Sequence, residues 1–208
     1  MGCDIHMFTE RKSEIDGHVK WSNVDNWKYN RYYTPDNEDG EPQMEINSVY
    51  RDRNYRLFAT LAGVRDYSDN TEMVDEPRGF PCDASPQVKE EYGEWGCDGH
   101  TPSWFTFREL KEFAKEHTTT THKGLVSLEG AKRLDEYGIP PDSWCQGTSD
   151  PTYVWRTWTV EGGALDGLME ALTERFKDEF WLFGTSYEDG RYNPEIEDEF
   201  RIVFWFDN

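Results

Sequence analysis

The sequence predicts a single α+β domain over residues 1–208, built on an antiparallel or mixed sheet with several short helices. Segments at the two ends of the chain have the composition of strands, and helix-capping residues open several short segments between them. The chain is also 15% aromatic, which supplies side chains for a core and excludes wholesale disorder. A length of 208 residues can bury such a core without disulfides or a structural metal.

Strands are expected at both ends of the chain. Polar and apolar residues alternate over residues 4–8, and Asp16-Gly17 then predicts a hairpin turn into a second strand. The run from Arg201 to Phe206 is apolar on both faces and fits an interior strand. We expect the first and last strands to be neighbours in one sheet, because that pairing keeps both termini ordered. A further strand is expected over residues 153–159.

Helix signals lie between these strands. Five helices are predicted. The first begins after Asn54 with Leu57, Phe58, Leu61 and Ala62 on one face, and the second runs from Ser85-Pro86 to Glu91. The third opens at Thr106 with a capping box completed by Glu109, and the last two run from Ser127 to Tyr137 and from Leu165 to Phe176. The polar segment 23–47 is expected to be a long loop or flap. His117 and His122 flank a threonine run that is expected to be a solvated helix end.

The net charge of the chain limits the classes of partner that it is expected to bind. There are 42 acidic and 22 basic residues, for a net charge of −20, so direct nucleic-acid binding is not expected. Solubility, a cation site and mimicry of DNA each account for such an acidic chain. The four cysteines form no C-x-x-C pair, the N-terminus has no secretory pattern, and no run is apolar enough to span a membrane. A cytoplasmic location is therefore expected.

The strongest candidate site is the D-x-H pattern of Asp4 and His6. Residues two apart on a strand point to the same face, so both side chains could ligate a divalent metal of unknown identity. Pairing of the chain ends would bring Asp207 close to both of them. The alternative is a buried Asp–His hydrogen bond that fixes the strand.

A second candidate site precedes the capping box at Thr106. Asp98, His100, Thr101 and Ser103 lie just before a helix N-terminus, where backbone N–H groups attract anions. Common turn and cap residues give an equally simple account of them. Arg78, in a glycine-flanked loop, could fork onto a phosphate or carboxylate of a ligand, or pair with one of the chain's own carboxylates.

Several islands of the sequence together resemble a known family. They are Met1-Gly2-Cys3-Asp4-Ile5-His6, the stretch from Arg53 to Arg65, the stretch from Arg78 through Asp98-Gly99-His100 to Trp104, and the ending Arg201 to Asn208. In these islands the chain resembles small proteins encoded by tailed phages and some bacteria that typically begin M-G-C-D-I-H. The resemblance implies a phage or prophage setting and the host cytoplasm, and it implies no reaction. Members of that family often carry H-S-H-S where this chain has His100-Thr101-Pro102-Ser103, so a two-histidine metal motif is incomplete here.

Three functions remain open at this point. The first is a metal-assisted hydrolase of a small phosphorylated or nucleotide-like molecule. Its metal ligands would be Asp4, His6, Asp98 and Asp207; His100 would be a ligand or general acid; and Arg78, Thr101 and Ser103 would hold the anion. The second is a non-catalytic protein that sequesters a host signalling nucleotide or inhibits a host defence enzyme. The third is an acidic DNA mimic or a virion-associated protein. A small anionic ligand and a host protein are the expected partners.

Overall fold

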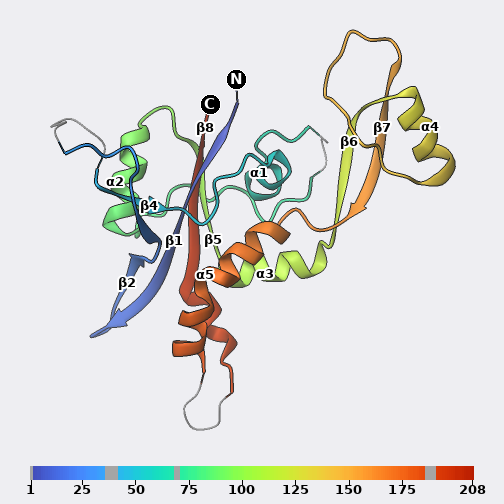
Figure 1. Cartoon of the computed structure of the whole chain (residues 1–208). Coiled ribbons are helices and arrows are strands. Elements are labelled where there is room, and N and C mark those ends of the chain that lie inside the picture. Colours follow the sequence, from blue (N-terminus) through green and yellow to red (C-terminus); the bar gives the residue numbers. More distant parts are fainter. Residues whose placement is uncertain (1, 36–41, 68–70, 186–190) are drawn as a thin grey trace. The chain divides into compact units, whose positions relative to one another are not determined.

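The computed structural model describes residues 2–35, 42–67, 71–185 and 191–208 and is a mixed α+β structure, as predicted (Figure 1). The chain groups into two compact units. Unit 1 comprises Met1–Arg53, Pro77–Leu110 and Leu168–Asn208, and unit 2 comprises Asn54–Glu76 and Lys111–Gly167. The single domain expected from the sequence stays a prediction. Among the described residues, none of the helices has the length and apolar composition of a transmembrane span.

Unit 1 is built on a four-stranded antiparallel sheet with the order β2-β1-β8-β5. Its strands are β1 (Asp4–Ile15), β2 (His18–Asn23), β5 (His100–Thr106) and β8 (Phe200–Asp207). The predicted pairing of the first and last strands is confirmed, and the two termini lie together in Figure 1. The predicted hairpin turn is confirmed as well: Asp16 and Gly17 have φ of 52° and 75°, as a two-residue turn between strands requires.

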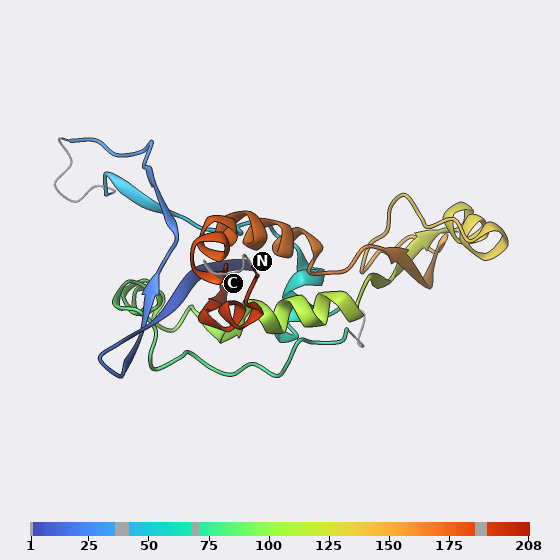
Figure 2. The same ribbon diagram turned by 90° about the horizontal axis from the view of Figure 1, so that it is seen from below.

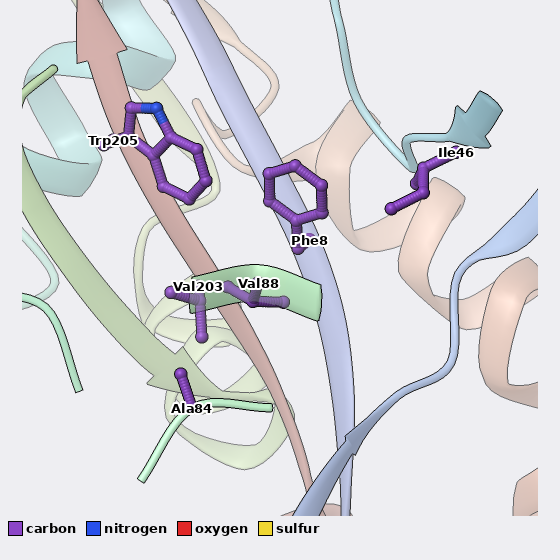
Figure 3. Close-up of a cluster of buried hydrophobic side chains, with 6 residues drawn as sticks. All are labelled: Phe8, Ile46, Ala84, Val88, Val203 and Trp205. Carbon is purple, nitrogen blue, oxygen red and sulfur yellow. The ribbon is translucent and has the colours of Figure 1, made fainter. Parts of the chain in front are cut away.

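Strand β8 occupies the interior position that its composition predicts, because both its faces are covered. Alternate residues of a strand point to opposite faces. On one face, Val203 and Trp205 of β8 join Phe8 of β1 in a cluster with Val88 of α2 (Pro86–Trp95) (Figure 3). On the other face, Phe200 of β8 contacts two phenylalanines of α5 (Asp166–Gly184), with ring centroids 4.6 and 5.1 Å apart. The short helix η1 (Pro194–Glu199) lies beside the end of α5 (Figure 2).

A buried ion pair joins the two central strands. Glu10 of β1 and Arg201 of β8 are direct cross-strand partners, and their side chains are 0% and 2% exposed. The Arg201 Nε donates to one Glu10 carboxylate oxygen over 2.8 Å, and the other oxygen accepts from the backbone N–H of Ser85 at 2.6 Å. The guanidinium also contacts Asp83 at 3.0 Å and lies 3.9 Å from the ring centroid of Trp21. The pair therefore ties the segment that opens α2 to the sheet.

We expect Glu10→Gln to destabilise unit 1 strongly. The substitution removes the buried anionic partner of the guanidinium and leaves only the exposed Asp83, and breaking a buried pair in this way costs about 3–5 kcal/mol. Chemical denaturation of the full chain measures the loss. Asp142→Asn is the matched control, because it breaks an exposed pair with Arg133 and should cost less than about 1 kcal/mol. Equal losses in the two variants would contradict the role given to Glu10.

The helix-capping predictions are confirmed at four helices. Asn54 caps α1 (Tyr55–Ala62), Ser85 caps α2, and Ser127 caps α4 (Leu128–Tyr137), which ends at Gly138. Thr106 and Glu109 form the predicted capping box at the start of α3 (Phe107–Glu116): the Glu109 carboxylate accepts from the Thr106 N–H at 2.7 Å, and the Glu109 N–H donates to the Thr106 hydroxyl at 3.2 Å. Each cap satisfies backbone N–H groups that the helix leaves without an internal partner.

The stability that the Glu109 carboxylate contributes to this cap should depend on pH. Burial raises the pKa of Glu109, but hydrogen bonds from Arg78 and Thr106 outweigh it, so the pKa lies below its ordinary value of 4.5. The stabilisation is complete above that ordinary value and is lost as the pH falls through the lowered pKa. The stability difference between wild type and Glu109→Gln should therefore shrink on acidification, as measured by denaturation at several pH values. A difference independent of pH would contradict this cap.

Unit 2 contains a two-stranded antiparallel sheet of β6 (Thr119–Ser127) and β7 (Tyr153–Glu161). Helix α4 packs on one face around a core of Val126, Ala131 and Trp158. The expected strand over residues 153–159 is thus confirmed. The expectation of a solvated helix end at residues 117–122 is wrong from Thr119 onward, where β6 begins. The threonines there are β-branched, which favours a strand, and they pair with β7.

Three other predictions need correction. The expected loop at 23–47 contains a second hairpin, β3 (Asn26–Tyr29) and β4 (Met44–Asn47), whose pairing is stabilised by apolar contacts with the sheet; residues 36–41 of this segment lie outside the described part. Helix α5 continues past Phe176 to Gly184, because Phe180 packs against Phe107 and Phe200. Helix α2 continues past Glu91 to Trp95.

Candidate functional site

A pocket of about 660 Å³ lies in unit 1 on the α2 side of the sheet. Its floor is the start of β1 and the end of β8, one wall is α2, and another wall is the β3–β4 hairpin with the residues that follow it. The lining includes Asp4, His6, Phe8, Trp27, Met44, Glu45, Ile46, Arg51, Glu90, Glu91, Glu94, Trp95 and Asp207. The volume is within the usual range for small-molecule sites.

Cross-strand register brings the predicted residues of the floor together. Asp4 and Asp207 are direct partners across β1 and β8, and His6 lies two residues further along the same face. The Asp207 carboxylate accepts from the Asp4 backbone N–H at 3.1 Å and lies 3.3 Å from the His6 Nε2. The His6 ring is held by Trp95, with ring centroids 4.0 Å apart. The expected proximity of Asp207 to Asp4 and His6 is therefore confirmed.

Arg53 neutralises Asp4. Its guanidinium donates two hydrogen bonds to the Asp4 carboxylate, at 2.5 and 2.6 Å, and these bonds hold the pKa of Asp4 below its ordinary value. Gly2 permits this approach, since a Cβ at that position would lie 2.5 Å from an Arg53 nitrogen. Asp4 is thus committed to a cation of the chain itself.

Arg53→Gln should raise the pKa of Asp4 towards its ordinary value, because the substitution removes both the ionic hydrogen bonds and the positive charge. The titration of the Asp4 carboxyl followed by NMR measures this change. Lys28→Gln, which removes an exposed partner of Glu45 instead, should leave the Asp4 titration unchanged. An Asp4 pKa that does not move in Arg53→Gln would contradict the pairing.

The α2 wall carries the strongest negative charge. Glu90, Glu91 and Glu94 all line the pocket from this helix. Burial, and then the neighbouring charges of Glu94 and Glu90, raise the pKa of Glu91, while Arg51 acts in the opposite direction. Three carboxylates on one helical turn repel one another, so a positive group in the pocket would stabilise this wall.

The hairpin wall is largely apolar. Trp27, Met44 and Ile46 line the pocket from β3 and β4, and Ile46 is anchored in the core cluster beside Phe8 (Figure 3). Arg51 donates to the Ile46 carbonyl oxygen at 2.5 Å, which fixes the chain at the end of β4. Apolar and aromatic groups therefore face the carboxylates of α2 across the pocket.

Among the described residues, the lining has six carboxylates and two basic side chains. The acids are Asp4, Glu45, Glu90, Glu91, Glu94 and Asp207, and the bases are His6 and Arg51. Arg53 pairs with Asp4 and Lys28 pairs with Glu45, which leaves four carboxylates facing one guanidinium and one imidazole. This charge disfavours an anionic ligand and favours a cation. Trp27 and Trp95 add aromatic rings to the lining, and such rings attract organic cations.

The other predicted site residues lie elsewhere in unit 1. His100 is the cross-strand partner of Phe206, on the face opposite to His6, and its ring stacks on Phe206 with centroids 6.0 Å apart. Thr101 lies at a β-bulge with φ of 50° and contacts the His100 ring. Asp98 is in the exposed turn after α2, where its N–H donates to the Trp95 carbonyl.

Arg78 and Ser103 serve the fold. Ser103 is fully buried inside β5, so it is not at the N-terminus of α3, and its hydroxyl accepts from the Arg78 N–H at 3.1 Å. The Arg78 guanidinium forks onto the Glu109 carboxylate with bonds of 3.1 and 2.7 Å. The alternative predicted for Arg78, pairing with one of the chain's own carboxylates, is thus confirmed.

The predicted metal ligands do not form one cluster. Asp4, His6 and Asp207 are close, but Asp4 is held by Arg53 and Asp98 is in a separate turn. Within the described ranges, no group of three or more His, Cys, Asp or Glu side chains has an arrangement that could hold a metal ion.

A second pocket, of about 520 Å³, lies within unit 2. Its polar residues hold neighbouring segments together: Arg56 donates to the Thr71 hydroxyl at 2.9 Å, and the His117 Nε2 is 3.0 Å from Glu72. The other ring nitrogen of His117 contacts the Phe113 carbonyl at the end of α3. These contacts account for Arg56, Glu72 and His117 as parts of the fold.

Comparison with known proteins gives no relative: no protein-family model, curated protein or solved structure matches this chain. The geometry of the unit 1 pocket is therefore the basis for inferring a function. Sequence reasoning found its floor but missed its walls. The glutamates of α2 have the pattern of a solvated helix face, and only the position of Trp95 behind them could have indicated a site.

Proposed function

We propose that this chain is a non-catalytic binding protein whose unit 1 pocket takes an organic cation, such as an amine or a guanidinium group. The observation that carries the proposal is the arrangement of glutamates on α2 opposite the tryptophan-containing hairpin wall. This is the second of the functions predicted from the sequence, with a positively charged ligand in place of the anion expected there.

The charge of the lining supports a cation over a nucleotide. A phosphate entering the pocket would meet Glu90, Glu91 and Glu94 on one side and Asp207 on the floor, against the single guanidinium of Arg51. Four carboxylates repel a phosphate more than one guanidinium attracts it. An ammonium group would instead gain several carboxylate partners and relieve the repulsion among the glutamates.

The tryptophans support an organic cation over a bare metal ion. Divalent ions need several converging oxygen ligands, and the described carboxylates do not converge in that way. The ring faces of Trp27 and Trp95 add a cation–π contribution that an alkylammonium or guanidinium group can use. His6, held between Asp207 and Trp95, fixes the floor against which such a ligand would lie.

Titration calorimetry with spermidine tests the proposal, with AMP and calcium chloride as the alternative ligands. Spermidine should bind at one site per chain, and its affinity should fall as salt is raised, because the attraction is between partly exposed charges. Binding of AMP without binding of spermidine would overturn the proposal and return the function to the anionic ligand predicted from the sequence.

The double variant Glu91→Gln, Glu94→Gln should bind spermidine about tenfold more weakly, because it removes two of the charges on the α2 wall. Glu170→Gln is the matched control: it removes an exposed carboxylate of α5 outside the pocket and should leave the affinity unchanged. Equal weakening per charge removed in the two variants would show that net charge, and not the pocket, holds the cation.

A further inference from the structure

The β3–β4 hairpin carries an apolar stripe that is longer than the pocket. Trp27 is the cross-strand partner of Ile46, and Tyr29 is the partner of Met44, so all four side chains lie on one face of the hairpin. Ile46 is buried in the core of unit 1. The other three remain open to solvent, with exposed fractions of 54% for Trp27, 59% for Tyr29 and 42% for Met44.

This stripe extends the pocket along the molecular surface. Trp27 and Met44 line the pocket, while Tyr29 continues the same face beyond it. The ring of Tyr33 meets that of Tyr29 edge to face, with centroids 6.2 Å apart, and so supports it from the side. A ligand confined to the pocket would leave much of this stripe in water. Exposed apolar surface of this kind, beside polar residues, is typical of protein interaction sites.

We infer that the ligand of the unit 1 pocket is a basic, amphipathic segment of a partner protein. Its apolar side chains would lie along Trp27, Tyr29 and Met44, and a Lys or Arg side chain would enter the pocket between the α2 glutamates and Trp27. The inference rests on the proposed function and names the class of partner for that same site.

Charge complementarity decides the chemistry of this partner. The stripe borders a wall with Glu90, Glu91 and Glu94, and the whole chain has a net charge of −20, so an acidic segment would be repelled at both short and long range. Tyrosine, tryptophan and methionine, together with arginine from the partner, are residue types that concentrate at the centres of protein interfaces. A neutral apolar segment would leave the carboxylates of the pocket without partners.

Three peptides of equal length separate the contributions, each labelled and titrated against the full chain by fluorescence anisotropy. One alternates Lys with Leu, one alternates Lys with Ser, and one alternates Glu with Leu. The Lys–Leu peptide should bind at least about tenfold more tightly than the Lys–Ser peptide, because only the first can use the stripe. The Glu–Leu peptide should not bind.

Tyr29→Ser tests the stripe outside the pocket. This variant should weaken the Lys–Leu peptide about tenfold and leave spermidine binding unchanged, since Tyr29 does not line the pocket. Tyr137→Ser, which removes a tyrosine at the end of α4 that is 70% exposed, is the control and should change neither. The melting temperatures of both variants establish that they are folded.

Each other outcome has a definite meaning. Equal binding of the Lys–Leu and Lys–Ser peptides, or no effect of Tyr29→Ser on the Lys–Leu peptide, with spermidine still bound, would overturn this inference and leave a small-cation pocket. If the wild-type protein does not bind spermidine, the proposed function is overturned as well.

Discussion

The buried ion pair between Glu10 and Arg201 is the constraint on which the geometry of unit 1 depends. It joins the two central strands, which come from opposite ends of the chain. The Glu10 carboxylate also accepts a hydrogen bond from the backbone N–H of Ser85, at the start of α2. Because Ser85 also caps α2, the position of that helix over the sheet is set by a charge buried within the sheet itself. The α2 glutamates and Trp95 owe their places above β1 to this contact.

Because side chains alternate along β1 and β8, one face of these strands packs in the core and the other carries the polar groups of the site. One face carries Ile5, Met7, Phe204 and Phe206, which are buried in the core. The other face carries Glu10, Phe8, His6 and Asp4 in order along β1, so it changes from a buried ion pair through an apolar contact to a polar floor. A single strand thus anchors α2 at one end and forms the floor of the pocket at the other.

The sequence predicted those parts of the site that depend on local pattern. Asp4 and His6 share a face because strand alternation is fixed, and Asp207 joins them because an apolar last strand needs an interior position. The capping box of Thr106 and Glu109 is likewise a local signal. His100 shows the limit of such reasoning. A β-bulge and the pairing with Phe206 set the face on which it lies, and neither can be read from the residues around it. The threonine strand β6 and the hairpin β3–β4 were missed because tertiary pairing, and not periodicity, makes them strands.

The central claim is that the pocket between α2 and the β3–β4 hairpin binds a positively charged group. NMR chemical-shift mapping of the full chain with spermidine tests it most directly, because the indole N–H signals of Trp27 and Trp95 report from two walls and the amide of Asp4 reports from the floor. The account predicts saturable shifts concentrated at these three residues, with the signals of His117 and Thr121 in the pocket of unit 2 unmoved. Shifts concentrated in unit 2, or spread evenly over exposed acidic residues without saturation, would contradict it.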